Sequence, residues 1–334
     1  MATSVEVATT AVENEPQSAE KRDDTSRVWP RLTLGEWEST YATLHRWLQI
    51  AGKTRLALAP MQNHWWQTTL YVTARGLTTS PMPYGDRTFE VDFDFLDHLV
   101  AVRTSKGETR GIPLEPHSVA DFYTRYMAMM SALEIDFDIS PTPSELEDKT
   151  PFADDETRAS YDPDAAHRCW RILAQTDRVL KEFRGRFIGK SSPSHFWWGA
   201  FDLACTRFSG RSAPKHPGGI PNLPDYVTFE AYSHECISAG WWPGSIGGLV
   251  AEPAFYAYAY PMPPECADAS VKPEAAYFHP EMREWILPYE SVRVAADPDA
   301  MLLEFLQSTY DVAADLGKWD REALERPVEV ESPR

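Results

Sequence analysis

Hydrophobic side chains recur at the spacing of an α-helix in several long segments of the chain. The first segment begins after Thr33, which is followed three residues later by Glu36 in the pattern of a capping box. Its apolar stripe consists of Trp37, Tyr41, Leu44, Leu48 and Ala51. Two further helices are predicted to begin at residues 162–163 and 297–298, because an aspartate followed by a proline is a typical helix start.

Other segments alternate apolar and polar positions, as strands with one buried face do. Residues 89–95, with the sequence FEVDFDF, place apolar side chains on one face and Glu90, Asp92 and Asp94 on the other. Residues 254–260, with the sequence AFYAYAY, carry tyrosines where the earlier segment has acids. We expect another part of the chain, or a ligand, to cover this tyrosine face.

Two stretches of the sequence resemble one another. NHWWQTTLYVTARGL begins at Asn63 and SHFWWGAFDLACTRF begins at Ser194, and superposing them places His195 on His64. In both halves a predicted helix precedes this segment, and further strands and a helix follow it. The pattern predicts an α+β fold with an internally duplicated α-β-β-β-β-α unit. Each unit would contain a mainly antiparallel sheet with packed helices, a strand would begin at each of the two histidines, and a pseudo-twofold axis would relate the units.

The composition along the chain indicates where these units begin and end. The polar N-terminus is predicted to be disordered, and a segment rich in proline, serine and acids separates the halves. The predicted divisions are a tail at 1–27, a first repeat at 28–140, an acidic Pro/Ser linker at 141–162, a second repeat at 163–322 with an insertion at about 212–248, and a C-terminal tail at 323–334.

The overall charge and the cysteine content narrow the classes of function. The 334-residue chain has a formal net charge of −18, which repels phosphate backbones, so we expect no nucleic-acid partner. No apolar run approaches the roughly 18 residues of a membrane span, and no signal peptide is recognisable. The four cysteines are widely spaced, which favours free thiols and a cytoplasmic location.

Histidines are the first candidates for chemistry. His64 and His195 each precede bulky aromatic residues, and a pseudo-twofold axis would bring them together in a cleft between the repeats. The alternative is that both are core-edge histidines bound to the backbone. The polar segment AYSHECIS adds His234 and Glu235, but neighbouring strand residues point to opposite faces, so both enter one pocket only across a bulge.

Arginines and aromatic residues supply candidate substrate contacts. Arg75 and Arg207 lie beside glycine turns, where arginine can bind a carboxylate or a phosphate, although many such arginines pair with acids instead. Four aromatic residues in or near the insertion would form the walls of the site: Tyr232, Trp241, Trp242 and Tyr258. The sequence lacks the H-E-x-x-H, G-x-S-x-G and Walker patterns, which excludes several well-known enzyme classes.

Long strings of this sequence resemble a bacterial family catalogued as a domain of unknown function. The resemblance is carried by NHWW with TARGLTTSPMPYGDR, by SPSHFWWGAFDLACTRFSGR and by EAYSHECISAGWWPG, and it extends over almost all of residues 29–322. It implies that the chain is one family-wide unit. It implies no reaction, cofactor or catalytic residue.

From these residues we expect a cytoplasmic small-molecule enzyme with an aromatic-lined cleft between the repeats and an anionic substrate. His64, His195 and His234 would either carry out acid–base chemistry or bind a divalent metal such as zinc or iron, with Glu235 as a further candidate. The alternative is a non-catalytic module of the same fold that binds a small molecule or another protein.

Overall fold

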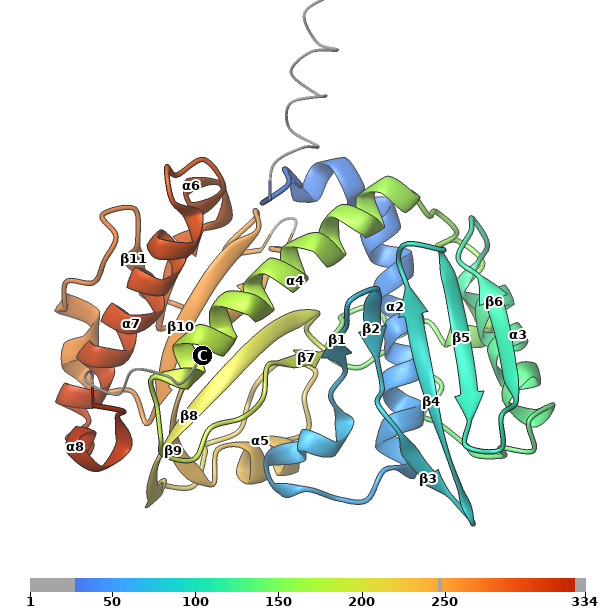
Figure 1. Ribbon diagram of the computed structural model, residues 1–334, viewed down its shortest axis with the longest axis horizontal. Helices are drawn as coiled ribbons and strands as arrows, with labels where there is room; N and C mark the ends of the chain where they lie inside the picture. Colours follow the sequence, from blue (N-terminus) through green and yellow to red (C-terminus); the bar gives the residue numbers. More distant parts are fainter. Residues whose placement is uncertain (1–27, 246–247, 328–334) are drawn as a thin grey trace, which may run out of the picture.

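A computed structural model describes residues 28–245 and 248–327 of the chain. It contains two antiparallel sheets of six strands each, together with several helices, and it confirms the predicted α+β class. Figure 1 shows the two sheets side by side. The N-terminal tail predicted at 1–27 lies outside the described residues.

The first half contains helix α2 (Leu34–Leu58), the 3₁₀-helix η1 (Asn63–Thr68), the first sheet and helix α3 (Val119–Ser131). The sheet has the order β1-β2-β4-β5-β6, and β3 pairs with β4. Its strands are β1 (Tyr71–Val72), β2 (Gly76–Thr78), β3 (Met82–Tyr84), β4 (Arg87–Asp94), β5 (Leu99–Thr104) and β6 (Thr109–Pro113).

The second half begins with α4 (Pro163–Gly185) and contains the second sheet in the order β11-β12-β10-β9-β8-β7. Its strands are β7 (His195–Trp197), β8 (Asp202–Ser212), β9 (His234–Trp242), β10 (Ala254–Tyr260), β11 (Tyr277–His279) and β12 (Glu284–Pro288). Its other helices are α5 (Asp225–Ala231), α6 (Tyr289–Arg293), α7 (Pro298–Leu316) and α8 (Arg321–Leu324). Short 3₁₀-helices occur at η2 (Phe152–Asp154) and η3 (Pro264–Asp268).

The predicted helix starts are confirmed, because the expected side chains satisfy the first backbone N–H groups. The Thr33 N–H donates to the Glu36 carboxylate across 3.4 Å. The Asp162 carboxylate accepts from two N–H groups at the start of α4, and Asp297 accepts from one at the start of α7.

The two sheets are joined where Leu70 and Phe196 exchange two backbone hydrogen bonds of 2.9 Å. One connected hydrophobic core extends from Trp29 in the first half to Ala314 in the second. Both halves contain a helix, an antiparallel sheet and a further helix in this order. The duplication itself stays a prediction.

The strand predicted to begin at His64 is wrong. A strand does begin at His195, but β7 ends at Trp197 and a turn over residues 198–201 separates it from β8. Residues 63–68 form η1, in which His64 and Trp65 have left-handed backbone angles, with φ of 58° and 62°. Contacts with α5 hold this conformation: the Trp65 indole donates to the Val227 carbonyl across 3.1 Å. Tertiary contacts therefore replace the strand geometry that the aromatic residues favour.

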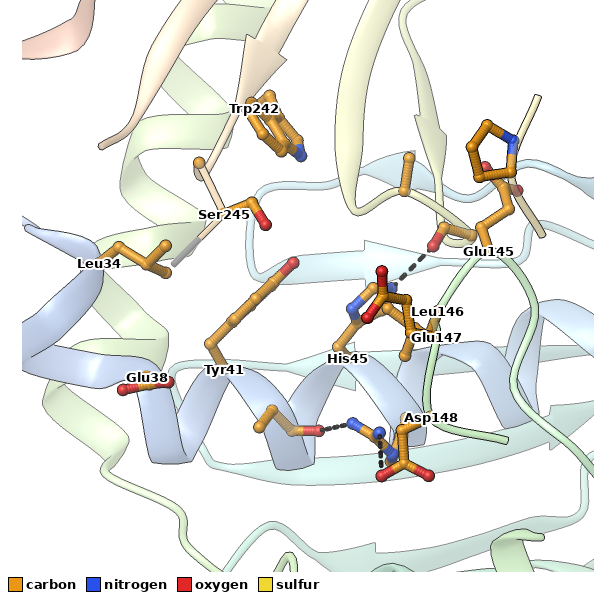
Figure 2. Close-up of a pocket in the computed structure, with 16 residues that line it drawn as sticks. Leu34, Glu38, Tyr41, His45, Glu145, Leu146, Glu147, Asp148, Trp242 and Ser245 are labelled. Atoms are coloured by element: carbon orange, nitrogen blue, oxygen red, sulfur yellow. Dashed lines mark hydrogen bonds and ion pairs between the residues drawn. The ribbon is translucent and has the colours of Figure 1, made fainter. Parts of the chain in front are cut away.

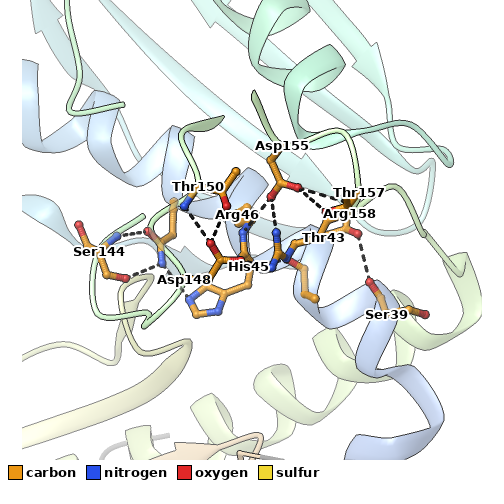
Figure 3. A network of polar contacts seen from close by, with 12 residues as sticks. Ser39, Thr43, His45, Arg46, Ser144, Asp148, Thr150, Asp155, Thr157 and Arg158 are labelled. Atoms are coloured by element: carbon orange, nitrogen blue, oxygen red, sulfur yellow. Dashed lines mark hydrogen bonds and ion pairs between the residues drawn. The ribbon is translucent and has the colours of Figure 1, made fainter. Parts of the chain in front are cut away.

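Helix α2 is buried on all sides between Thr43 and Arg55, although its sequence predicts one apolar stripe. The predicted linker 141–162 covers its polar side (Figure 3). There the Arg46 guanidinium lies 3.2 Å from the Asp155 carboxylate, and Arg158 also pairs with Asp155. Arg46 can be buried here because it has an acidic partner, whereas Lys53 and Arg55 donate to the hydroxyl groups of Ser144 and Ser80.

The beginning of the predicted C-terminal tail is also paired with the rest of the fold. The Leu324 carbonyl accepts from the Ile188 N–H across 2.8 Å, and the Arg326 N–H donates to the Arg186 carbonyl across 2.9 Å. Residues 328–334 lie outside the described part of the chain.

Substitution of Gly52 tests the packing of α2. A Cβ atom at this position would lie 2.3 Å from the Trp198 ring, so we predict that Gly52→Ala lowers the free energy of unfolding by about 1–3 kcal/mol. Gly35→Ala in the same helix is the control, because its Cβ would meet nothing within 4 Å. Chemical denaturation should show this variant to be as stable as the wild type or slightly more stable. Equal stabilities for the two variants would contradict the predicted contact.

Candidate functional site

The second sheet has two chemically different faces, because successive strand residues point to opposite sides. The odd-numbered residues of β8, β9, β10 and β12 form the core face, which α4 and α7 cover. Figure 1 shows α4 lying across this sheet. The members of this face include Leu203, Cys205, Arg207, Ile237, Trp241, Phe255, Ala257, Trp285 and Leu287.

The even-numbered residues of the same strands line a cavity of about 390 Å³, which we call the sheet cavity. They are Asp202, Thr206, Phe208, Cys236, Trp242, Ala254, Tyr256, Tyr258, Glu284 and Ile286. The insertion forms the opposite wall through Ile220, Leu223, Val227 and Thr228, and η1 adds His64 and Trp66. The tyrosine face is therefore covered by another part of the chain, which is one of the two alternatives expected from the sequence. A cavity remains between this face and the insertion.

Asp202 is the most deeply buried acid of the sheet cavity, with 9% of its surface exposed. The Tyr256 hydroxyl donates a hydrogen bond to its carboxyl group. Gly240 makes this contact possible: a Cβ atom there would lie 2.9 Å from the Tyr256 hydroxyl and 2.2 Å from the Leu203 carbonyl oxygen. The tyrosine thus reaches across β9 over a position that has no side chain.

The environment of Asp202 shifts the pKa of its carboxyl group towards neutral pH. Burial raises the pKa of the Asp202 carboxyl to about 7, the hydrogen bond from Tyr256 opposes this shift, and the charge of Glu145 adds to it. A carboxyl group that is partly protonated at pH 7 can both donate and accept a proton.

Glu284 lines the same cavity from β12. Ala257 pairs with Trp285, which places Tyr258 and Glu284 next to each other on the cavity face. Burial, and then the charge of Asp202, raise the pKa of the Glu284 carboxyl to about 8. In the described part of the chain, no hydrogen bond or ion pair satisfies this carboxyl group.

Two further pockets share lining residues with the sheet cavity. The first, which we call the helix pocket, has a volume of about 420 Å³ and lies between α2 and the end of β9. Figure 2 shows Tyr41 and His45 of α2 on one side of this pocket and Trp242 on the other. Glu145 and Trp242 line both the helix pocket and the sheet cavity. The second, the tyrosine pocket, has a volume of about 440 Å³ and shares Tyr232, Tyr258, Met282 and Glu284 with the cavity.

Glu145 reaches the boundary between the cavity and the helix pocket because the backbone opposite it carries no side chain. A Cβ atom at Gly199 would lie 1.9 Å from the Glu145 Oε1 atom. Burial raises the pKa of the Glu145 carboxyl, and the charges of Lys149 and Lys53 oppose this shift. Three acids, Glu145, Asp202 and Glu284, therefore line one cavity.

The structure brings His64 and His234 together, with ring centroids 5.7 Å apart. His64 lines the sheet cavity, and its Nδ1–H donates to the Ala231 carbonyl across 3.1 Å, which leaves Nε2 as a proton acceptor. Burial lowers the pKa of His64, so its ring is neutral at pH 7. His234 is exposed, and its Nδ1 lies 3.1 Å from the Ser233 hydroxyl.

The structure does not bring His195 to the same point as the other two histidines. It is 1% exposed, and its ring contacts Trp66, Tyr71 and Trp197 but neither of those histidines. Burial, and then the charges of nearby arginines, lower its pKa to about 3. Within residues 28–245 and 248–327, no group of three or more His, Cys, Asp or Glu side chains could hold a metal ion. The zinc or iron site stays a prediction.

The other predicted residues divide between the two faces of the sheet. Tyr232, Trp242 and Tyr258 line the sheet cavity, whereas Trp241 is fully buried on the core face. Glu235 points away from the cavity and accepts from the Ser209 hydroxyl and the Arg211 guanidinium, each across 2.8 Å. The alternation of β9 explains why consecutive residues separate in this way.

Neither predicted arginine lies at the cavity. The Arg207 guanidinium is on the core face, 3.4 Å from the Phe183 ring centroid and 4.2 Å from that of Tyr310. Arg75 lies at the first sheet and pairs with Asp94 and Asp97. Among the described residues, no lysine or arginine lines the sheet cavity. The expected clamp for an anionic substrate is therefore not found there.

Sequence reasoning did not identify Asp202, Glu284, Tyr256 or Glu145 as members of a site. Asp202 and Glu284 each stand directly before a run of apolar strand residues, which is a signal of a buried acid. Glu145 belongs to a segment that reads as a solvated linker. Its place in the site depends on contacts that the sequence does not reveal.

The chain was compared with known proteins. A family described as a family of unknown function, DUF5996, matches residues 29–326, so the chain belongs to this family. Neither the curated proteins nor the solved structures contain a match. None of the helices in the described residues combines the length and the apolar character that crossing a membrane requires.

The pKa of Asp202 should be visible in the pH dependence of stability. The pKa rises from its ordinary 3.8 to about 7 on folding, so the protonated group stabilises the fold fully below pH 3.8, and this stability is lost as the pH rises through 7. At about 1.4 kcal/mol per pKa unit, the loss is on the order of a few kcal/mol. We predict that Asp202→Asn removes this part of the pH dependence in denaturation experiments.

Carboxyl NMR titration provides the direct measurement. Tyr256→Phe should raise the pKa of Asp202 above its wild-type value, because it removes the hydrogen bond to the carboxylate. Tyr258→Phe is the matched control, since its hydroxyl bonds to Tyr232 and not to Asp202. Titration of Asp202 near pH 4 in the wild type would contradict the assignment.

Proposed function

We propose that this member of the DUF5996 family is an acid–base enzyme that binds a small organic substrate in the sheet cavity. In this proposal Asp202 exchanges a proton with the substrate. A cavity of about 390 Å³ falls within the size range of small-molecule sites, and its mixture of aromatic walls and few polar groups is typical of them.

The observation that carries the proposal is the position of Asp202. Its carboxyl group faces the cavity, receives a hydrogen bond from Tyr256, and titrates close to the pH at which most enzymes work. Acid–base groups are most effective when their pKa lies near the working pH, and perturbed carboxyls in clefts are concentrated at functional sites.

His64 supports the same chemistry from the opposite wall. Its neutral imidazole carries a free Nε2 lone pair, so it is a second group that could accept a proton from a bound substrate. The proposal keeps a histidine in the site, as the sequence led us to expect, but assigns the main acid–base role to the Asp202 carboxyl group. The substrate would be neutral or cationic, because the described cavity walls contain three acids and no lysine or arginine.

We also propose a cytoplasmic location. All four cysteines are free and buried, at Cys169, Cys205, Cys236 and Cys266. Unpaired cysteines are typical of proteins in a reducing compartment.

A ligand screen with proton counting tests the proposed function. Small organic molecules would be screened by saturation-transfer NMR, and the ligands that compete for one site would be titrated calorimetrically at pH 7 in buffers of different ionisation enthalpy. We expect binding to be accompanied by uptake or release of up to about one proton. We expect this exchange to be lost in Asp202→Asn.

Asp92→Asn is the control for the same chemical change, because Asp92 pairs with Arg103 on the first sheet. Proton exchange that persists in Asp202→Asn, or a screen without any competing ligands, would contradict the proposal. Binding in the cavity without proton exchange in the wild type would favour the non-catalytic binding module.

A further inference from the structure

Aromatic rings that contact one another line part of the tyrosine pocket. The ring of His216 stacks on that of Tyr232 with centroids 4.8 Å apart, and both contact Tyr260, at 5.0 Å and 5.1 Å. The Tyr258 ring lies 6.3 Å from that of Tyr232, and their hydroxyls are hydrogen-bonded across 3.0 Å. His216 and Tyr232 belong to the insertion, whereas Tyr258 and Tyr260 belong to β10, so these ring contacts join the insertion to the sheet.

An unpartnered acid occupies the boundary between this aromatic group and the sheet cavity. Glu284 lines both spaces and lies next to Tyr258 on the sheet. Arg283 also lines the tyrosine pocket, but it forms no ion pair with Glu284 in the described residues. His216 is kept neutral, because burial lowers its pKa, so it places no positive charge among the rings.

Several aromatic rings and one carboxyl group line the same pocket, and this combination suits a cation with apolar substituents. The face of an aromatic ring attracts a cation, and quaternary ammonium groups are recognised by cages of such rings. A primary ammonium or a metal ion would require more hydrogen-bonding or ligating groups than the rings supply. An anion would gain no attraction from either carboxyl group, and it would be repelled wherever Glu284 or Asp202 is ionised.

We propose that Glu284, with Tyr232, Tyr258 and Tyr260, binds an alkylated ammonium group of the ligand. This inference rests on the proposed function, since the remainder of the same ligand would extend along the sheet cavity to Asp202. It names the chemical class of the substrate: a small organic molecule with a quaternary or tertiary ammonium group at one end. Because the pKa of Glu284 is about 8, the ammonium group would displace the proton of this carboxyl group into solvent and compensate the charge that results.

Two probes of the same shape separate the charge from the apolar contact. Choline and its neutral analogue 3,3-dimethylbutan-1-ol would be titrated into the full-length protein and followed by tryptophan fluorescence and calorimetry. We expect choline to bind about tenfold more tightly than the neutral alcohol, or better, and Glu284→Gln to abolish this preference. Equal affinities for the two probes in the wild type would overturn the proposal.

Three further variants identify the groups responsible. Tyr258→Leu removes a ring and should weaken choline binding several-fold, whereas Tyr258→Phe keeps the ring and should bind choline nearly as the wild type does. Glu281→Gln is the control for a loss of negative charge at an exposed neighbouring position. An effect of Glu281→Gln equal to that of Glu284→Gln would reduce the preference to general electrostatics and overturn the proposal.

The ligand screen and the choline titration together distinguish the ammonium site from the proposed acid–base function. If neutral molecules from the screen bind in the sheet cavity with proton exchange at Asp202 while choline and tetramethylammonium do not bind, the ammonium site is overturned and the acid–base proposal stands. If choline binds with the expected preference but neutral ligands from the screen bind without any proton exchange that Asp202→Asn removes, the ammonium site stands and the catalytic role of Asp202 fails. If no molecule of either kind binds, both are overturned.

Discussion

The alternation of side chains along β8, β9, β10 and β12 is the constraint on which the candidate site depends. It directs Leu203, Trp241 and Trp285 into the core and Asp202, Tyr256 and Glu284 to the other face. α4 and α7 cover the core face, and the insertion with η1 covers the other without filling it. A register slip of one residue would exchange these faces, so the stability of the core also fixes the position of the acids.

The burial of helix α2 links the rest of the fold to this site. Its polar side binds the segment 141–162 through Gln49, which bonds to both the N–H and the carbonyl of Ser144. Lys53 adds a bond of 2.9 Å to the Ser144 hydroxyl. Glu145 follows directly and is thereby held against Gly199 at the edge of the sheet cavity. The contacts of α2 that stabilise the fold thus also place an acid at the site.

Much of the architecture could be predicted from the sequence. Period-two alternation identified β4 and β10, aspartate–proline pairs identified the starts of α4 and α7, and the tyrosine face was correctly expected to be covered. η1 could not be predicted, because its left-handed backbone at His64 depends on contacts with α5, which is distant in sequence. The local preference of these aromatic residues for a strand is overridden here by the contacts of η1 with α5.

The candidate site was predicted only in part. His64, Tyr232, Trp242 and Tyr258 do line the cavity. Tyr232 and Trp242 belong to the aromatic-rich insertion, Tyr258 to the alternating tyrosine strand and His64 to the repeated histidine motif, and each of these is a recognisable signal. Arg207 was misplaced because its position beside a glycine turn does not reveal which face of β8 it occupies. The roles proposed for Asp202 and Glu284 rest on burial and on the absence of a basic partner in the described surroundings, and both are properties of the three-dimensional structure.

Anomalous X-ray scattering from a crystal soaked in tetramethylarsonium tests the central claim most directly, because arsenic replaces the nitrogen of tetramethylammonium and can be located without ambiguity. The account predicts one dominant arsenic peak beside the Glu284 carboxyl group, among the rings of Tyr232, Tyr258 and Tyr260. Peaks confined to acids on the outer surface, with none in the sheet cavity or the tyrosine pocket, would contradict it.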